Sequence, residues 1–274
     1  MPLPTVHAHR RSLIAPVLVC ALALLAAATS TDPCSPAWHA FDAAGVGAPG
    51  DTVSAIVSWD PDGPAGPLPS QVVVGGSFTS AGSSVAQSIA AWDGSSWQPL
   101  GAGVDAPVSA LALFNNQLIV GGAFTNAGAA PASHVALYDG SQWHALGSGL
   151  NANVFALAVY NGDLIAAGSF TNSIARWDGA AWQPLAIGMD GPVFALTVFN
   201  NHLIAGGVFT HAGDTLVSNI AQWDGSSWQA LDGGTDDAVR ALAVAPDNTL
   251  IAGGTFILAG GQPANHVARW TGAA

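Results

Sequence analysis

The chain has 274 residues, of which 50% are apolar and only 8% are charged, and its formal net charge is −12. That length suffices for one large all-β domain or two small ones, and the apolar content excludes broad disorder. Every acidic residue is Asp, since the sequence contains no Glu, and it contains no Lys either. A surface this acidic repels phosphate backbones and anionic lipid headgroups, so we expect neither a nucleic-acid partner nor a membrane-surface partner.

The N-terminus has the pattern of an export signal. Arg10 and Arg11 precede an apolar run, residues 13–28, that ends in small residues, as secretory signal peptides do. We expect residues 1–28 to be removed, residues 29–35 to form a short linker, and the protein to be secreted, either outside the cell or into a periplasm. The arginine pair also resembles a twin-arginine signal. A retained anchor is the alternative, although the run is shorter than the roughly 20 residues that span a bilayer.

Two short patterns recur along the rest of the chain. The first is Gly-Gly-x-Phe-Thr, and the second is an aromatic residue followed by Asp-Gly-x-x-Trp. Copies of the first begin about 46 residues apart, except for one interval of 39 residues. Internal repeats of this length are typical of propellers and solenoids. The first pattern starts at Gly75, Gly121, Ala167, Gly206 and Gly253, and the second starts at Trp92, Tyr138, Trp177, Trp223 and, in degenerate form, Trp270.

Each repeat unit contains four strand-like runs joined by turn signals. In the second unit these runs are Val108–Phe114, Leu118–Gly122, His134–Tyr138 and Trp143–Leu146. Runs of four to seven residues suit strands better than helices, and turn pairs such as Asn-Asn and Asp-Gly separate them. Four strands repeated every 40 to 50 residues are the mark of a β-propeller. The sequence therefore predicts an all-β, five-bladed β-propeller of four-stranded blades.

The two ends of the repeat region complement each other. The fifth unit stops at Ala274 before a fourth strand, whereas residues 36–41 resemble a spare fourth strand in which Trp38 takes the place of Trp97 or Trp143. We expect this N-terminal strand to complete the last blade and close the propeller, which would remove an open sheet edge. The propeller domain would then comprise residues 36–274.

The motif wording resembles known propeller repeats over residues 36–274. The Gly-Gly doublet with spaced aromatics resembles kelch-type repeats and the central domain of galactose oxidase. The Ile-Ala-x-Trp-Asp-Gly-x-x-Trp wording is closer to repeats of fungal cortical cell-polarity marker proteins and of uncharacterised bacterial secreted proteins. The resemblance implies the fold. Galactose-oxidase chemistry needs copper held by Tyr and His, with a Tyr bonded to Cys. Tyr138 is one of only two tyrosines and occupies a repeat position, so that site is not carried over.

Polar residues precede each innermost strand and would lie at one mouth of the central channel. They stand two or three positions before the first Val of the strand. Carboxylate and amide oxygens suit a polar ligand or a cation such as Ca²⁺. The alternative is that Asp and Asn satisfy backbone donors in their turns. The residues are Asp51, Asp105, Asn151, Asp190, Asp236 and Asp237.

Two classes of function remain open. The first is a monomeric binding module for a glycan or protein partner, with no catalysis and no cofactor unless Ca²⁺ binds through Asp105, Asp190 and Asp236. The second is a carbohydrate-active enzyme, a glycosidase, lyase or oxidase, with its site at the channel mouth. A glycosidase needs paired carboxyl groups, one with a raised pKa, and the same three Asp are the candidates. An enzyme site would interrupt the repeat with residues found in one unit only. The loops before the innermost strands instead carry similar residues in each unit, which favours the binding module.

Overall fold

The computed structural model describes residues 45–63 and 65–272. The predicted signal peptide at 1–28, the linker at 29–35 and the N-terminal strand at 36–41 lie outside the described residues. Those three assignments, and the expected closure of the last blade by residues 36–41, stay predictions. Within the described part of the chain, no helix is long and apolar enough to cross a membrane.

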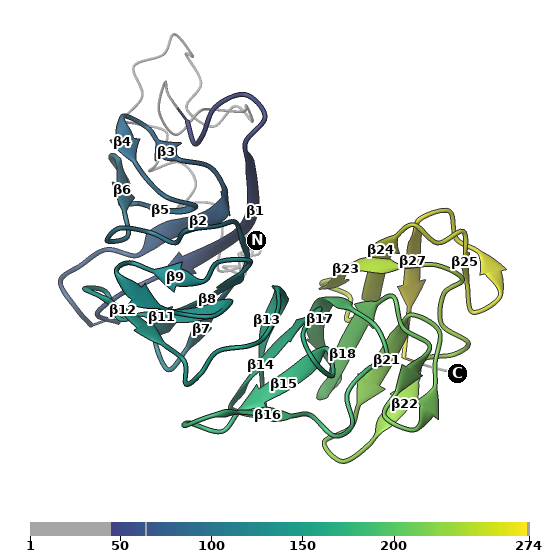
Figure 1. The fold of residues 1–274 in the computed structure, drawn as a ribbon. Coiled ribbons are helices and arrows are strands. Elements are labelled where there is room, and N and C mark those ends of the chain that lie inside the picture. Colours follow the sequence, from purple (N-terminus) through teal and green to yellow (C-terminus); the bar gives the residue numbers. More distant parts are fainter. Residues whose placement is uncertain (1–44, 64, 273–274) are drawn as a thin grey trace, which may run out of the picture. The chain divides into compact units, whose positions relative to one another are not determined.

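Five antiparallel sheets follow one another along the chain and confirm the predicted all-β, five-bladed β-propeller (Figure 1). Four of them have four strands, and the fifth has three within the described residues. The blades are β1 (Thr52–Trp59), β2 (Gln71–Ser77), β5 (Ile89–Trp92) and β6 (Trp97–Pro99); β7 (Val108–Phe114), β8 (Gln117–Gly122), β11 (Val135–Tyr138) and β12 (Trp143–Ala145); β13 (Val154–Tyr160), β14 (Asp163–Gly168), β15 (Ile174–Trp177) and β16 (Trp182–Pro184); β17 (Val193–Phe199), β18 (His202–Gly207), β21 (Ile220–Trp223) and β22 (Trp228–Ala230); and β23 (Val239–Val244), β24 (Leu250–Gly254) and β27 (Val267–Trp270).

The long loops that follow the Phe-Thr motif form small hairpins. Each pairs two strands of two residues. The third blade has no such hairpin among the described residues, because its connection is seven residues shorter. The pairs are β3 (Ser80–Ala81) with β4 (Ser84–Val85), β9 (Asn126–Ala127) with β10 (Ala130–Pro131), β19 (His211–Ala212) with β20 (Thr215–Leu216), and β25 (Leu258–Ala259) with β26 (Gln262–Pro263).

Consecutive blades pack face to face around the Gly doublets. A Cβ atom on Gly121 of β8 would lie 2.5 Å from Val154 Cγ1 of the next blade. Atoms cannot approach that closely, so only Gly fits there. Gly75 meets Val108 and Gly206 meets Val239 in the same way. At three of the four junctions between the described blades, a valine of one inner strand therefore packs against a glycine of the blade before it. At the junction of blades three and four, Ala167 takes the place of this glycine and lies in one core cluster with Val193.

The repeated aromatics fill the outer part of each junction. The Trp143 indole N–H donates a hydrogen bond to the Leu100 carbonyl oxygen at 3.0 Å, and the rings of Tyr138 and Trp143 lie 4.9 Å apart. Both side chains are buried. Burial of such a ring contributes about 2 to 3 kcal/mol. Packing between blades thus accounts for these aromatics without a ligand.

Candidate functional site

The predicted channel-mouth carboxylates hold the loops of their own blades. Asp105 Oδ1 accepts hydrogen bonds from the backbone N–H groups of Thr125 and Asn126 at 2.8 and 3.0 Å. Its Oδ2 accepts from Thr125 Oγ1 at 2.9 Å and Asn126 Nδ2 at 2.7 Å. Asp105 thus joins the loop before β7 to the hairpin that follows β8, about twenty residues along the chain.

The same device recurs in the next three blades. Asn151 Oδ1 accepts from the Thr171 N–H at 3.0 Å. In blade four, Asp190 Oδ1 accepts hydrogen bonds from the backbone N–H groups of Thr210 and His211 at 2.8 and 2.9 Å. In blade five, Asp236 Oδ1 accepts hydrogen bonds from two backbone N–H groups of the following hairpin, at 2.8 and 2.9 Å. The Thr of Gly-Gly-x-Phe-Thr is therefore the partner of the channel-mouth residue in blades two to four.

The two remaining predicted residues make more local contacts. Asp51 Oδ2 accepts from the Ala48 N–H at 2.9 Å. Asp237 Oδ1 accepts from the Ala238 N–H at 2.7 Å. Hydrogen bonds from Ala238 and Thr255, followed by the nearby Arg240 charge, lower the pKa of the Asp237 carboxyl. No group of three or more His, Cys, Asp or Glu side chains in residues 45–63 and 65–272 is arranged to hold a metal ion.

The hydrogen bonds keep two of these carboxyls strongly acidic. Burial raises the pKa of Asp105, but four hydrogen bonds from Asn126 and Thr125 outweigh it and lower the pKa to about 2. For Asp190 burial also raises the pKa, and bonds from Thr210 and His211 lower it well below its usual range. A glycosidase acid needs the opposite shift. These two side chains are therefore suited to loop attachment and not to proton donation.

A different set of residues breaks the repeat. Every innermost strand has a β-bulge between a Val and an Ala of the repeat. A bulge inserts one extra residue and re-aims its side chain, and bulges are common beside functional sites. The Val and the Ala are the same in all five blades, but the residue between them changes. In chain order these bulge residues are Ser54, Ser109, Phe155, Phe194 and Arg240.

Three bulge residues form a continuous row across blades three to five. The rings of Phe155 and Phe194 lie 5.6 Å apart at an interplanar angle of 53°, and the Arg240 guanidinium carbon lies 5.0 Å from the centroid of the Phe194 ring. The two Phe are half-buried and Arg240 is exposed. Two aromatic surfaces and a cation are thus partly open to solvent on adjacent inner strands.

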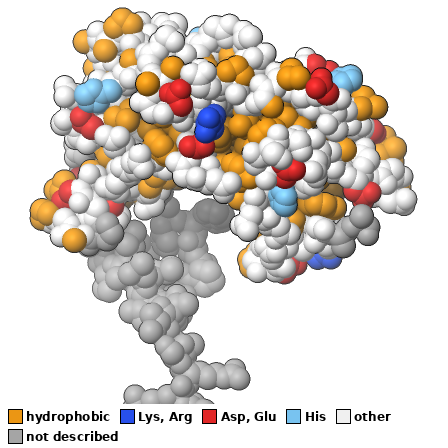
Figure 2. All heavy atoms as spheres, turned by 90° about the horizontal axis from the view of Figure 1, so that it is seen from below, with side chains coloured by type: hydrophobic (Ala, Val, Ile, Leu, Met, Phe, Trp, Pro, Cys, Tyr) orange, Lys and Arg blue, Asp and Glu red, His pale blue; other side chains and the backbone are white. Residues whose placement is uncertain are grey.

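Arg240 also differs from the other arginines of the described residues. Arg176 pairs with Asp163 at 3.0 Å and Arg269 with Asp247 at 3.5 Å. Within residues 45–63 and 65–272, Arg240 has no carboxylate oxygen within 4.0 Å. Figure 2 shows that the acidic side chains on the face it draws are scattered and form no single patch. The row Phe155–Phe194–Arg240 therefore departs from the repeat at one equivalent position in three consecutive blades.

Sequence reasoning missed this row although the signal was present. The aligned wording Val-x-Ala occurs at the start of all five inner strands, with x equal to Ser, Ser, Phe, Phe and Arg. The residue x varies from blade to blade while the Val before it and the Ala after it are constant. Packing between blades therefore does not fix the residue type at x. Nothing in the alternation of the strand revealed that x is a bulge, because the extra residue is defined by pairing with the neighbouring strand.

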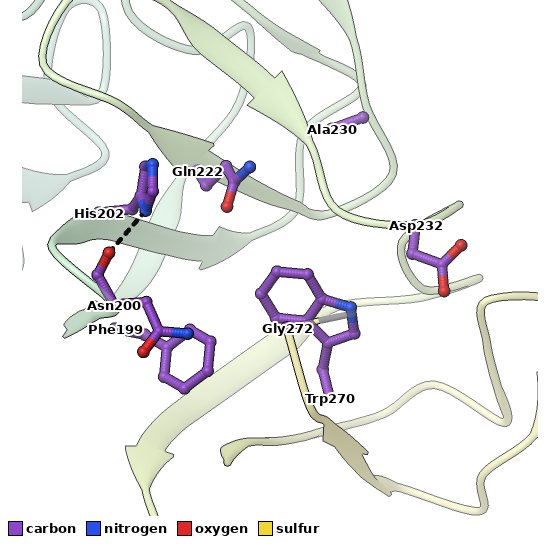
Figure 3. A pocket seen from close by; sticks show the side chains of 8 residues that line it. All are labelled: Phe199, Asn200, His202, Gln222, Ala230, Asp232, Trp270 and Gly272. Atoms are coloured by element: carbon purple, nitrogen blue, oxygen red, sulfur yellow. Dashed lines mark hydrogen bonds between the residues drawn. The ribbon is translucent and has the colours of Figure 1, made fainter. Parts of the chain in front are cut away.

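One hollow lies between blades four and five (Figure 3). Its volume is about 340 Å³, and Phe199, His202 and Trp270 line it. A smaller hollow beside it is lined by Leu231, Gly260 and Trp270. At the junction of blades one and two, the counterparts of Leu231 and Gly260 are Leu100 and Gly128, which contact Trp143. These hollows therefore occupy the place that a fourth-strand Trp fills in the complete blades, and we assign no ligand to them.

Comparison with known proteins agrees with the fold and gives no activity. Five repeated antiparallel blades define the chain as a β-propeller. Residues 245–270 match the family described as "Domain of unknown function (DUF5122) beta-propeller". No curated protein matches the chain.

Solved structures resemble the chain in fold. A chain of the Mitotic Checkpoint Complex matches with a TM-score of 0.53 and 17% identity, over 82% of this chain and 62% of that one. The computationally designed Ika4 protein matches with a TM-score of 0.40 and 19% identity, over 63% of this chain and 97% of that one. The WD40 propeller domain of Doa1 matches with a TM-score of 0.46 and 13% identity, over 73% and 59% of the two chains. At these identities the likeness concerns the fold alone.

Proposed function

We propose that this β-propeller is a binding module for a glycan or protein partner, with no catalysis of its own, and that the row Phe155–Phe194–Arg240 contacts the partner. The observation that carries the proposal is that this row breaks the repeat where the packing does not require it. Aromatic surfaces beside an Arg are typical of contact sites, because they bury apolar area at low entropic cost while the guanidinium donates hydrogen bonds.

The channel-mouth carboxylates have a supporting part in this proposal. Asp105 and Asp190 hold the hairpins that surround the inner strands. The second strands of two such hairpins carry exposed apolar side chains, with Val85 of blade one at 73% and Leu216 of blade four at 70% of full exposure. Loops that a rigid scaffold positions in this way often carry the residues that contact a binding partner. Four of the six predicted polar residues, Asp105, Asn151, Asp190 and Asp236, thus belong to the proposed binding face through the loops that they position.

A glycan array with neutral and acidic glycans, combined with a peptide array, tests the proposal. The double variant Phe194→Ala, Arg240→Gln should bind any hit at least about tenfold more weakly, which corresponds to about 1.4 kcal/mol. Arg176→Gln is the matched control, since it removes an exposed arginine from another site. Hits that the double variant binds as well as the wild type would refute the assignment, and release of reducing sugar from a hit would refute the absence of catalysis.

Secretion is part of the same proposal. Two arginines followed by an apolar run and small residues support export with removal of residues 1–28. N-terminal sequencing of the protein recovered outside the cytoplasm should begin near Thr29. Recovery of an uncleaved chain from the membrane fraction would establish the retained anchor instead.

A further inference from the structure

Within the described residues, blade three lacks the hairpin that the other four blades carry at the channel mouth. In blades two, four and five, one residue of the loop that enters the blade forms a β-bridge to this hairpin and is between 2 and 6% exposed. The bridges are Val104–Ala127, Met189–Ala212 and Thr235–Ala259. The counterpart in blade three is Leu150, which is only half-buried. The missing hairpin therefore leaves a gap in which an apolar side chain is partly uncovered.

A second apolar side chain lies on a loop that borders this gap. Ile187 is 61% exposed. Two residues further on, the Met189 N–H donates a hydrogen bond to the Asn172 carbonyl oxygen at 2.9 Å, and Asn172 belongs to the shortened connection of blade three. The equivalent residues of the other loops between described blades are small: Ala102, Ser148 and Gly233. Blade three thus combines a missing hairpin with an added aliphatic side chain beside it.

The gap adjoins the row Phe155–Phe194–Arg240. Asn151 Oδ1, four residues before Phe155, accepts a hydrogen bond from the Thr171 N–H at 3.0 Å, so the shortened connection lies against the loop that leads to this bulge. The contacts of 5.6 and 5.0 Å within the row limit its length to about 11 Å. About three residues of an extended chain cover that length, at about 3.4 Å per residue. The row therefore has an apolar end next to the gap and a cationic end at Arg240.

We infer that the row receives the C-terminus of an apolar polypeptide, an inference that rests on the binding function proposed above. The terminal carboxylate pairs with Arg240, and the side chains of the last residues contact Phe194 and Phe155. The preceding residues leave the channel mouth through the gap at blade three, where they contact Leu150 and Ile187.

The charges of the protein favour a single carboxylate on the partner. The planar guanidinium of an Arg matches a carboxylate and can bind both of its oxygens. In the described part of the chain, Arg240 has no carboxylate oxygen within 4.0 Å to occupy it. The formal net charge of −12 opposes a partner with many negative charges. A chain end that is apolar except for its terminal carboxylate satisfies both conditions.

The aliphatic side chains at the gap favour a polypeptide over a glycan. The two Phe rings alone would suit the apolar face of a sugar as well as an apolar side chain. Leu150 and Ile187 extend the apolar surface beyond the rings, and burial of this area against apolar side chains stabilises a complex. A sugar would instead present hydroxyl groups to them. Capture of a C-terminal carboxylate is, moreover, a recurring mode of peptide recognition.

A peptide library tests the carboxylate contact. Hexapeptides whose last three residues sample Ala, Ser, Leu, Ile and Phe are prepared as free acids and as C-terminal amides, and their affinities for the full chain are measured by fluorescence polarisation. The best free acid should bind at least about tenfold more tightly than its amide, because the amide loses a charge-assisted hydrogen bond. Arg240→Gln should abolish this preference, whereas Arg176→Gln, the matched control, should keep it.

The outcomes separate this inference from the proposed function. Equal binding of acid and amide by the wild type overturns the inference and leaves a binding module. So does binding that is confined to glycans, to decanoate or to peptides with an internal acidic residue. An acid preference that Arg240→Gln retains shows that another group holds the carboxylate and also overturns the inference. If neither these peptides nor the glycan and peptide arrays give a hit, the proposed function fails as well.

Peptide length tests the path through the gap. Ile187→Ser should weaken binding of the best hexapeptide at least about threefold, because apolar contact is lost, and should leave the tripeptide with the same last three residues unchanged. Val85→Ser, at an exposed valine of the blade-one hairpin, is the matched control.

A grafted hairpin closes the gap directly. Replacing residues 172–173 with a copy of residues 211–219 gives blade three the hairpin of blade four, and this variant should also discriminate against the hexapeptide and not the tripeptide. Its melting temperature establishes that it folds, and Ile187→Ser carries the test if it does not. Hexapeptide binding that Ile187→Ser leaves unchanged overturns the path through the gap.

Discussion

Arg240 and Phe194 are neighbours on adjacent blades, with the guanidinium carbon 5.0 Å from the ring centroid. They come from equivalent positions of two repeat units that otherwise keep the same wording. Both positions are bulges, and at both the residue type differs from the Ser of blades one and two. The contact is therefore a local feature added to the repeat scaffold, and it is the part of the molecule most open to direct test.

The Arg240–Phe194 contact predicts a measurable coupling. A double-mutant cycle with Phe194→Leu and Arg240→Met should give a coupling free energy of about 0.5 to 1 kcal/mol, the size of an exposed cation–π pair. Urea unfolding of the four chains measures it. Phe194→Leu combined with Arg176→Met should be additive, because Arg176 pairs with Asp163. Additivity in both cycles would show that the contact contributes nothing.

The indole of Trp143 should matter more than that of Trp228. Both are buried, but Trp143 donates to the Leu100 carbonyl, while Trp228 Nε1 has no hydrogen-bond partner in the described residues. Trp143→Phe removes this hydrogen bond, which contributes about 0.5 to 1.5 kcal/mol beyond the lost packing, while the Leu100 carbonyl oxygen still accepts from the Gly103 N–H at 3.0 Å. Trp228→Phe loses packing alone. Denaturant unfolding should place Trp143→Phe about 0.5 to 1.5 kcal/mol below Trp228→Phe, and equal losses would contradict the role of the bond.

Acid should weaken the fold through the loop carboxylates. The folded pKa of Asp105 is about 2, below the unfolded value of about 3.9. A depressed folded pKa contributes stability that is present above the unfolded pKa and lost as the pH falls through the folded pKa. We therefore expect a melting temperature that falls between about pH 4 and pH 2. After allowance for solvent screening, the share of Asp105 is of the order of 1 kcal/mol.

Asp105→Asn separates that contribution from general acid unfolding. Asn can accept the same backbone hydrogen bonds, as Asn151 does from Thr171, but it does not titrate. The variant should therefore lose less of its melting temperature between pH 4 and pH 2 than the wild type loses. A variant whose acid profile is parallel to that of the wild type would show that Asp105 has no part in it.

Calcium should not stabilise the protein. The Asp190 oxygens already accept hydrogen bonds from Thr210 and His211, and the shortest, from Thr210 Oγ1, measures 2.6 Å. A bound cation would have to displace these donors. We expect no change of melting temperature between chelator and millimolar Ca²⁺. A rise that Asp190→Asn abolishes would instead establish the cation site that the sequence left open.

Much of the local structure could be predicted because the same pattern of strand-like runs and turn residues recurs in five repeat units. The predicted first strand of unit two, Val108–Phe114, is β7 as observed. The third strand was expected from His134 but begins at Val135, because His134 has a φ of 67° and cannot continue a strand. The fourth strand was expected to reach Leu146 but ends at Ala145. Such differences of one residue arise where a turn decides the limit.

The candidate site was only partly predictable. The channel-mouth Asp and Asn could be found from their fixed offset to the inner Val. Their partners could not, because Thr125 lies twenty residues from Asp105 and nothing local links the two. The bulge row was missed for the same reason, since Phe155 and Phe194 are 39 residues apart and touch only across a blade junction.

The amino-acid sequence alone determined the number of blades, their strands and the residues that face a neighbouring blade, since all of these follow from short-range periodicity and from Gly positions that tolerate no side chain. The tertiary structure decided what each polar side chain binds and which side chains leave the strand pattern. Those outcomes depend on pairing between segments distant in the chain, and hydrogen-bond geometry and strand register exist only once the blades have formed.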